Sequence, residues 1–189
     1  MASMLVAAVG LAVVGLGGCG AGLTGFPLAP GQTVPGRTVR GRTCHARGSG
    51  LYSLPDPRCT PGAIDPAVTQ ANIASTICRR GYKRTVRPPE SVTEIEKRAS
   101  MDAYGDAGPP EDYEYDHLIP LELGGAANDP RNLWPEPGAS PNPKDLLENR
   151  LHALVCAGAL GLRAAQREIA TNWIAALVAW RDSPRRGGS

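Results

Sequence analysis

The chain has 189 residues, of which 42% are hydrophobic and 20% are charged, and its formal net charge is +2. This length is enough for one domain of ordinary size. A balance so close to neutrality excludes the strongly basic surface of a dedicated nucleic-acid-binding protein, so any contact with DNA or RNA has to use a local basic patch.

The beginning of the chain predicts export. Residues 4–18, MLVAAVGLAVVGLGG, are uncharged and apolar but shorter than the about 20 residues that a membrane-spanning helix needs. This is typical of a signal peptide, which we place at residues 1–18. The small residues before Cys19 resemble a bacterial lipoprotein cleavage site, so we expect a lipid anchor on Cys19 and a protein that is held in the cell envelope or secreted. Residues 19–36 lack charge and are rich in Gly, Pro, Ala and Thr, which predicts a flexible tether.

Four cysteines remain besides the one expected to carry lipid, namely Cys44, Cys59, Cys78 and Cys156. An even number in an exported chain is typical of disulfides, and four cysteines allow three connectivities. We favour Cys44 with Cys59, which closes a short loop, and Cys78 with Cys156, which ties an early helix to a late one. A zinc site is the alternative, but there is no Cys-x-x-Cys pair, and His45 has no partner at ligand spacing.

The first half of the domain is predicted to be irregular and then helical. Residues 37–64 have many turn-forming residues and no sustained period, which predicts an irregular segment closed by a disulfide. A helix is predicted next, because Asp65 is a good N-cap, Pro66 suits the first helical position and Gly81 would follow the end of the helix.

A second helix and a pair of strands are expected after it. Ser91 and Glu94 have the spacing of a capping box, and Gly105 would stop the helix that they begin. Residues 113–136 then predict two short extended segments that are joined by a Gly-Gly turn and a loop.

The last part of the chain is predicted to form two helices. Asn142 is the expected cap of the first, with Pro143 at its first position. Residues 162–180 have the period of an amphipathic helix, and the basic tail at residues 183–189 is expected to be disordered. The predicted fold is therefore α+β, a small β-hairpin flanked by helices and bridged by disulfides.

The segment DHLIPLELGGAANDPRNLWPE, residues 116–136, carries the candidate chemistry. Asp116 offers a carboxylate, a hard oxygen ligand suited to Mg²⁺, and the neutral imidazole of His117 can take a proton from water. Neighbours in a strand point to opposite faces, so both can reach one site only if the strand ends or bends there. The following Gly124 and Gly125 would allow this.

This segment and the helix after it resemble the ββα-metal motif of HNH endonucleases, and the match covers about a fifth of the chain. The wider pattern is similar to small exported bacterial proteins of HNH-like type. The resemblance implies His117 as general base, Asp116 as metal ligand and Asn132 as the residue that pins the loop and orients the histidine. It also implies one divalent cation, with Mg²⁺ favoured over Mn²⁺ or Zn²⁺, and nucleic acid as partner, with DNA favoured over RNA.

The sequence departs from the family pattern at the third ligand, because Pro141 stands where the family usually has His or Asn. On the following helix, one face carries polar side chains that could replace it, namely Asp145, Glu148, Asn149 and His152. We expect Asn149 or His152 to be the ligand, with Asn142 behind them. By its composition the face could equally be a solvated one.

A basic run precedes the hairpin and is the candidate for phosphate contacts. Its members are Arg79, Arg80, Lys83, Arg84 and Arg87. Short basic runs are usually only solvated, but this one falls between elements that would flank the hairpin. Trp134 and Trp173 have apolar neighbours and are predicted to lie in the core rather than to stack on bases.

The function that the sequence predicts is metal-dependent phosphodiester hydrolysis by one HNH-like domain at residues 37–182. The alternative is a non-enzymatic envelope lipoprotein that keeps the scaffold but has an incomplete metal site. A nuclease effector or toxin is a third reading, which the absence of a recognisable delivery domain disfavours. A third metal ligand on the helix would favour the nuclease, and its absence would favour the non-enzymatic scaffold.

Overall fold

The computed structural model describes residues 43–182. The predicted signal peptide, tether, lipidated Cys19 and basic tail lie outside them. The elements are β1 Arg47–Ser49, β2 Tyr52–Leu54, the 3₁₀ helix η1 Gln70–Asn72, α1 Tyr82–Val86, α2 Glu90–Tyr104, η2 Pro110–Asp112, β3 Tyr113–His117, η3 Leu121–Leu123, β4 Leu133–Pro137, α3 Pro143–Cys156 and α4 Leu162–Asp182. The predicted α+β class is confirmed, with two small antiparallel hairpins and four α-helices in this range.

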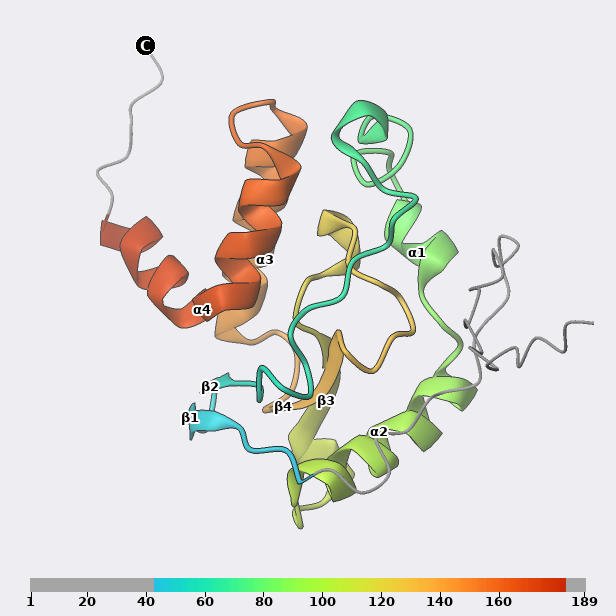
Figure 1. The fold of residues 1–189 in the computed structure, drawn as a ribbon, viewed down its shortest axis with the longest axis vertical. Coiled ribbons are helices and arrows are strands. Elements are labelled where there is room, and N and C mark those ends of the chain that lie inside the picture. Colours follow the sequence, from blue (N-terminus) through green and yellow to red (C-terminus); the bar gives the residue numbers. More distant parts are fainter. Residues whose placement is uncertain (1–42, 183–189) are drawn as a thin grey trace, which may run out of the picture. The chain divides into compact units, whose positions relative to one another are not determined.

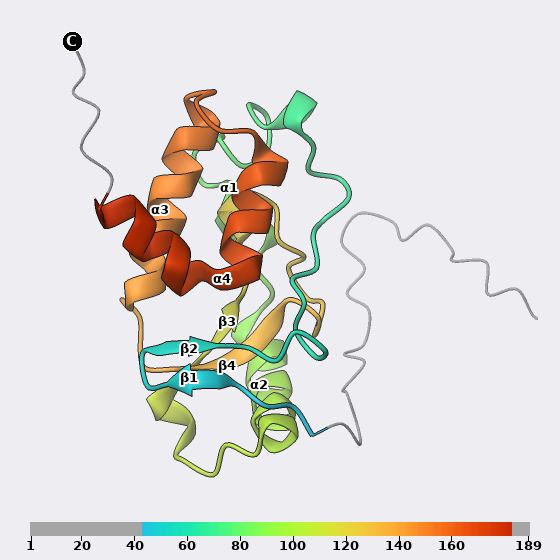
Figure 2. The same ribbon diagram turned by 60° about the vertical axis from the view of Figure 1, so that its left-hand side comes forward.

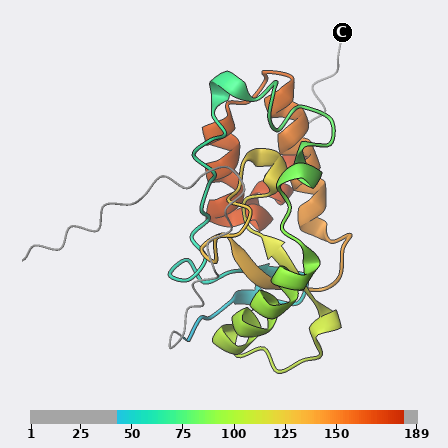
Figure 3. The ribbon, with the colours of Figure 1, turned by 90° about the vertical axis from the view of Figure 1, so that its right-hand side faces the viewer.

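The hairpin of β3 and β4 lies at the centre of the described domain. Its register pairs Tyr113 with Pro137 at one end and His117 with Leu133 at the other. In Figure 1 the helices α3 and α4 lie together above the hairpin, and α2 lies below it, in contact with both of its strands. The same order of helices, hairpin and α2 is visible from the side in Figure 3.

Helix α3 begins as the sequence predicts. The Asn142 side chain accepts hydrogen bonds from the backbone N–H groups of Lys144 and Asp145, and Asp145 returns a bond to the Asn142 N–H, which completes a capping box. Pro143 occupies the first helical position, where a missing N–H costs nothing.

The main core lies where α3 and α4 meet the segment after β3. Its fully buried side chains include Leu147, Val155, Leu118, Ile169 and Trp173. The predictions that Trp134 and Trp173 are core residues are both confirmed, because neither has exposed surface.

Helix α4 was expected to run without a break, but its backbone leaves the helical region at Asn172, where φ is −164° and ψ is 86°. The Asn172 side chain accepts a hydrogen bond from the N–H of Ala175, so it caps the second half of the helix. Within residues 43–182 no helix combines the length and the apolar character that a membrane span requires.

The predicted helix between Pro66 and Gly81 is wrong. The segment forms turns and the short η1, and an α-helix begins only at Tyr82. The reason is competition by polar side chains: Asn72 Nδ2 donates to the Ala67 carbonyl, and the hydroxyls of Ser75 and Thr76 donate to the Asn72 carbonyl.

The start of α2 also differs from the prediction, whereas its end at Gly105 agrees with it. Pro89 is the N-cap and no side chain caps the helix, so Ser91 and Glu94 lie inside it rather than forming a capping box. Gly105 ends the helix in the left-handed conformation, with φ of 73°.

The predicted irregular segment at residues 37–64 contains a hairpin that the sequence did not indicate. Strands β1 and β2 pair antiparallel, with Ser49 opposite Tyr52 and a two-residue turn of Gly50 and Leu51 between them. Gly50 has φ of 56°, as tight hairpin turns require. Figure 2 shows this small hairpin beside β4.

Both predicted disulfides are present, Cys44–Cys59 and Cys78–Cys156, with sequence separations of 15 and 78 residues. The first closes the loop that contains β1 and β2. The second ties the turn region before α1 to the last residue of α3.

We expect the second disulfide to contribute more to stability, because it closes the longer loop. Loop-closure entropy predicts a loss of about 4.5 kcal/mol for Cys78→Ala/Cys156→Ala and about 3 kcal/mol for Cys44→Ala/Cys59→Ala. Urea unfolding of the two double variants and the wild type measures both values. The estimate would be contradicted if both double variants unfolded at the same urea concentration as the wild type.

Candidate active site

One face of the β3–β4 hairpin carries a cluster of carboxylates. Side chains alternate along a strand, so Glu114 and Asp116 share a face of β3, and Glu136 of β4 lies directly opposite Glu114. Like charges placed opposite each other are destabilising. The cluster therefore needs a cation or protons to be stable.

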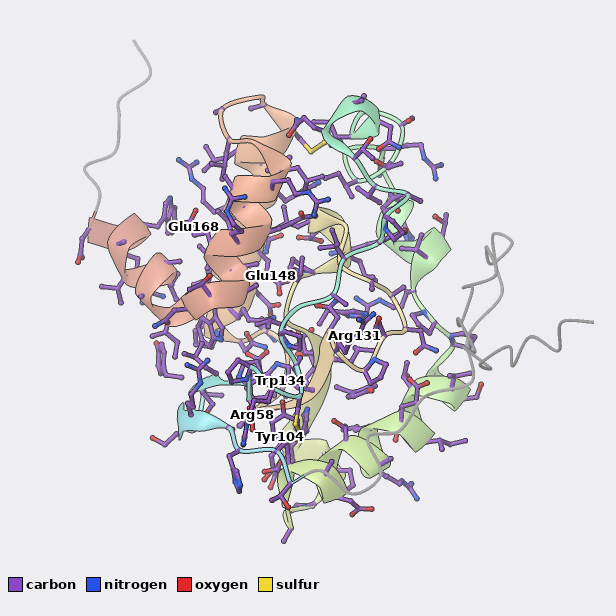
Figure 4. The ribbon with its side chains drawn as sticks, viewed as in Figure 1. Arg58, Tyr104, Arg131, Trp134, Glu148 and Glu168 are labelled. Atoms are coloured by element: carbon purple, nitrogen blue, oxygen red, sulfur yellow. A yellow bond between two sulfur atoms is a disulfide. The ribbon has the colours of Figure 1, made fainter. Side chains whose placement is uncertain are left out.

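The cation that lies among these carboxylates is the ammonium of Lys144, in the first turn of α3. Its side chain has no exposed surface, and its Nζ contacts Asp116 Oδ2, lies 2.5 Å from Glu148 Oε1 and lies 3.4 Å from Glu136 Oε2. Lys144 and Glu148 are four residues apart on α3 and so face the hairpin together. Figure 4 shows Glu148 on the inner side of α3, above the hairpin.

Burial and mutual charge shift the pKa values of this cluster strongly. Burial would raise the pKa of Asp116, but the charge of Lys144 opposes this shift. Together with smaller contributions from the charge of His117 and from hydrogen bonds to Lys144 and Glu136, it holds that pKa below its usual range. Burial raises the pKa of Glu148 to about 8 and that of Glu136 well above its usual range. The charges of the three carboxylates keep the pKa of Lys144 well above that of a free lysine, despite burial.

These shifts follow from the charge balance. With all three carboxylates ionised, Asp116, Glu136 and Glu148 around Lys144 carry a net charge of −2 in a buried place. The carboxyl of Glu136 lies close enough to that of Asp116 to donate a hydrogen bond to it when protonated. The chain alone therefore balances the excess by binding protons on Glu136 and Glu148.

His117 ends β3 and is held by the loop that follows. Only 5% of its surface is exposed. Its Nε2 lies 2.9 Å from the carbonyl oxygen of Ala127. A carbonyl can only accept, so Nε2 carries the proton and Nδ1 carries the lone pair. Burial lowers the pKa of His117, and the nearby charge of Asp116 opposes this shift, so the ring is neutral at pH 7.

Asn132 fixes the loop that holds His117. Its Oδ1 accepts from the Ile119 N–H at 2.9 Å, and its Nδ2 donates to the carbonyl oxygens of Ile119 at 2.9 Å and Ala126 at 3.1 Å. The amide thus joins the start of the loop to the residue before Ala127. It has no exposed surface, so water cannot replace these bonds and the loop has one conformation.

Asp116 and His117 leave β3 on opposite faces, as neighbours in a strand do. Asp116 contacts Lys144, His117 bonds to Ala127, and no hydrogen bond joins the two side chains. They remain close enough that the charge of each shifts the pKa of the other. The acid and the base therefore flank the end of the strand.

The two helix residues predicted as ligands do not face Asp116. The exposed Asn149 donates to the Asp145 carbonyl of its own helix. His152 Nε2 bonds to the Ile77 carbonyl at 3.0 Å, and this residue lies about 12 Å further along α3 than Lys144. The helix residue that contacts Asp116 is instead Lys144, whose ammonium also contacts Glu148.

His152 belongs to a different group. Ligand atoms of Cys78, His152 and Cys156 lie within 4.8 Å of one another, as a metal site would require. The two sulfur atoms are joined in a disulfide, however. A metal could use them only after reduction.

The predicted basic run lies on the surface around α1. Its members Arg79, Arg80, Lys83, Arg84 and Arg87 are all exposed. Lys83 forms an ion pair with Glu122 of η3 at 2.7 Å. The charge of Arg87 influences the pKa values of His117 and Glu114, so the end of the run lies near the candidate base.

Lys144 and Glu136 were not predicted as site residues. Glu148 was predicted only as one of the polar residues on a face of the helix, with Asn149 or His152 expected as the ligand. A signal for the helix pair was present: Lys144 and Glu148 lie at helical spacing with Leu151 and Val155, on the stripe that faces the core. For Glu136, the register of the hairpin was needed.

Comparisons of the chain with protein-family models, with curated proteins and with solved structures gave no match. The chemical role of this site is therefore argued from its geometry.

Proposed function

We propose that this protein hydrolyses phosphodiester bonds of nucleic acid, with DNA as the favoured substrate, at a metal-dependent site of HNH type formed by β3, β4 and α3. The observation that carries the proposal is the fixed tautomer of His117. Its Nε2 is bonded to the Ala127 carbonyl, so the unprotonated Nδ1 can act as a base at neutral pH.

In the proposed reaction, Nδ1 of His117 takes a proton from a water molecule as the water oxygen attacks phosphorus. The bond between phosphorus and the leaving oxygen then breaks. Asn132 keeps the Ala127 carbonyl in place, and this carbonyl stabilises the imidazolium that forms because it accepts the Nε2 hydrogen. Asn132 is thus a positioning residue in this scheme.

The cluster opposite His117 fits a divalent cation in two respects. Its donors are carboxylates, the ligands that Mg²⁺ and Mn²⁺ prefer, and its net charge of −2 when ionised matches the charge of such an ion. Asp116 and Glu148 would hold the ion. When bound, it would stabilise negative charge on the phosphate and the leaving oxygen.

The exposed basic run supplies the contact for the substrate in this proposal. Arg87 is the member whose charge reaches His117, and Arg84 lies one turn before it, in α1. Guanidinium groups bind phosphate oxygens in a bidentate manner. They would position the nucleic-acid strand so that one phosphate lies next to His117.

A plasmid-nicking assay tests the proposal. The chain without residues 1–18 is incubated with supercoiled plasmid and Mg²⁺, Mn²⁺ or Zn²⁺, with EDTA as control. We expect nicked circles with a divalent ion and none with EDTA. A protein that leaves the plasmid intact with every ion would refute the proposal.

Metal binding should release protons. The pKa of Glu148 is about 8 and that of Glu136 is raised, so at pH 7 these carboxyls hold protons that a bound cation displaces. We expect Mn²⁺ affinity to rise as pH increases from 6 to about 8 and then to level off. Calorimetry in two buffers of different ionisation enthalpy measures the released protons, and binding without release would contradict the assignment of the cluster.

One observation favours a second function, a non-enzymatic scaffold. The Lys144 ammonium already lies between Asp116 and Glu148, where it could take the place of a metal permanently. On this reading no cation binds to the wild type, but one binds to Lys144→Met, which has room and excess negative charge. The same calorimetric titration of both proteins separates the two functions.

A further inference from the structure

A pocket of about 610 Å³ lies away from the acidic cluster, between the loop after β2, the segment after β3 and the first half of α4. Its apolar surface comes from residues that include Pro61, Ile64, Ile119 and Ala170. Its basic side chains are Arg47, Arg163 and Arg167, and no acidic residue lines it. The pocket is therefore apolar in part and positively charged.

Arg163 and Arg167, near the start of α4, have no acidic partner in the part of the chain that the structure describes. Arg163 and Arg167 are exposed, and within residues 43–182 neither guanidinium has an ion pair or a hydrogen bond. They lie one turn apart in the first turns of α4, where the helix dipole adds to their positive potential. Two uncompensated cations beside a third, Arg47, favour an anionic ligand.

The wall of the pocket also contains a buried acceptor without a donor. Gln166 is 3% exposed, and its Nε2 donates to the Leu123 carbonyl at 2.8 Å, which fixes the orientation of the amide. Its Oε1 is buried and has no hydrogen bond within the described chain. Buried polar atoms are almost always paired, but this oxygen is closed off from the pocket as well as from water, so it is the arginines and the apolar surface that favour a ligand.

We propose that this pocket binds one nucleotide unit of a nucleic-acid strand, with the phosphate at the arginines and the base on the apolar surface. A base offers a planar apolar face, which would lie on apolar side chains of the pocket such as Ile64 and Ile119. The volume is within the range of small-molecule pockets.

The link to cleavage rests on the proposed function. Ile119 lines the pocket and is two residues beyond His117. Its backbone is the part of the loop that Asn132 holds at both its N–H and its carbonyl. A nucleotide bound in the pocket therefore lies against the same loop that positions His117, the proposed general base.

Fluorescence anisotropy of a labelled 12-nucleotide single strand, measured in EDTA so that no cleavage occurs, tests the pocket. Arg163→Ala/Arg167→Ala should weaken binding at least tenfold. The control Arg98→Ala/Arg181→Ala removes the same charge from exposed positions elsewhere and should change affinity by less than about threefold. Equal losses in the two variants, or no binding by the wild type, would overturn the proposal.

Two further arms identify the source of the nucleotide and separate this inference from the hydrolysis. Unlabelled deoxynucleoside monophosphate that displaces the strand, in the wild type but not in the pocket variant, also supports the site and shows that a free nucleotide suffices. Plasmid nicking is measured on the same proteins. Pocket-dependent binding without nicking rejects only the hydrolysis, and nicking without pocket-dependent binding rejects only the pocket.

Discussion

His117→Ala is expected to lower the rate of metal-dependent plasmid nicking by about 10²–10⁴-fold, the range that a general base contributes. The physical reason is that Nδ1 of His117 is the lone pair available for the water proton, because Nε2 is bonded to the Ala127 carbonyl. The measurement is the initial rate of supercoil loss at pH 7.5 with saturating Mg²⁺ or Mn²⁺.

Asn149→Ala is the matched control, since this residue is exposed and bonds only within its own helix. It should retain the wild-type rate. The His117 variant leaves the Ala127 carbonyl without its donor, which costs about 1–3 kcal/mol, so circular dichroism must show that the variant is folded. Equal nicking by the His117 variant and the wild type would point to a contaminating nuclease.

Lys144→Met is expected to destabilise the metal-free protein by about 3–5 kcal/mol, because it leaves the Asp116 carboxylate without its cation. The raised pKa of Lys144 means that the ammonium contributes fully at pH 7 and loses its effect only as the pH rises through that higher value. Urea unfolding in EDTA at pH 7 measures the loss.

Lys83→Met is the control for this effect. Lys83 also pairs with a glutamate, but 54% of its side chain is exposed, and such surface pairs contribute about 0–1 kcal/mol. The Lys144 variant should recover part of this stability at pH 5, because without Lys144 the pKa of Asp116 is no longer held below its usual range and burial favours the protonated form. If both lysine variants unfolded alike at pH 7, the buried cluster would not be what stabilises this region.

The parts of the fold that the sequence predicted correctly are those with strong local signals. Asn142 determines the start of α3 through its side-chain cap and Pro143 through its fixed φ. Gly105 ends α2 because its left-handed conformation is easily adopted only by glycine. The segment after Asp65 had similar signals and failed. There the side chains of Asn72 and Thr76 bond to nearby backbone and compete with the helix.

The candidate residues in the strands could be picked out from the sequence, whereas the residues that α3 brings to them could not. The local pattern predicted that Asp116 and His117 lie in the first strand, and they are the last two residues of β3. Asn132 bonds to Ile119 and Ala126, and its predicted role stays a prediction. Glu148 and Lys144 were harder to assign, because a buried lysine or glutamate is rare unless paired. Their pairing depends on how α3 packs against the hairpin, which is a tertiary contact that no local pattern encodes.

The central claim is that His117 acts as a base in phosphodiester hydrolysis, and chemical rescue tests it most directly. Nicking by His117→Ala is measured with increasing imidazole at several pH values, in the presence of the activating metal. We predict that the lost rate returns and follows the concentration of neutral imidazole. A variant that nicks at the wild-type rate without imidazole, or a rescue that follows the imidazolium ion, would contradict the claim.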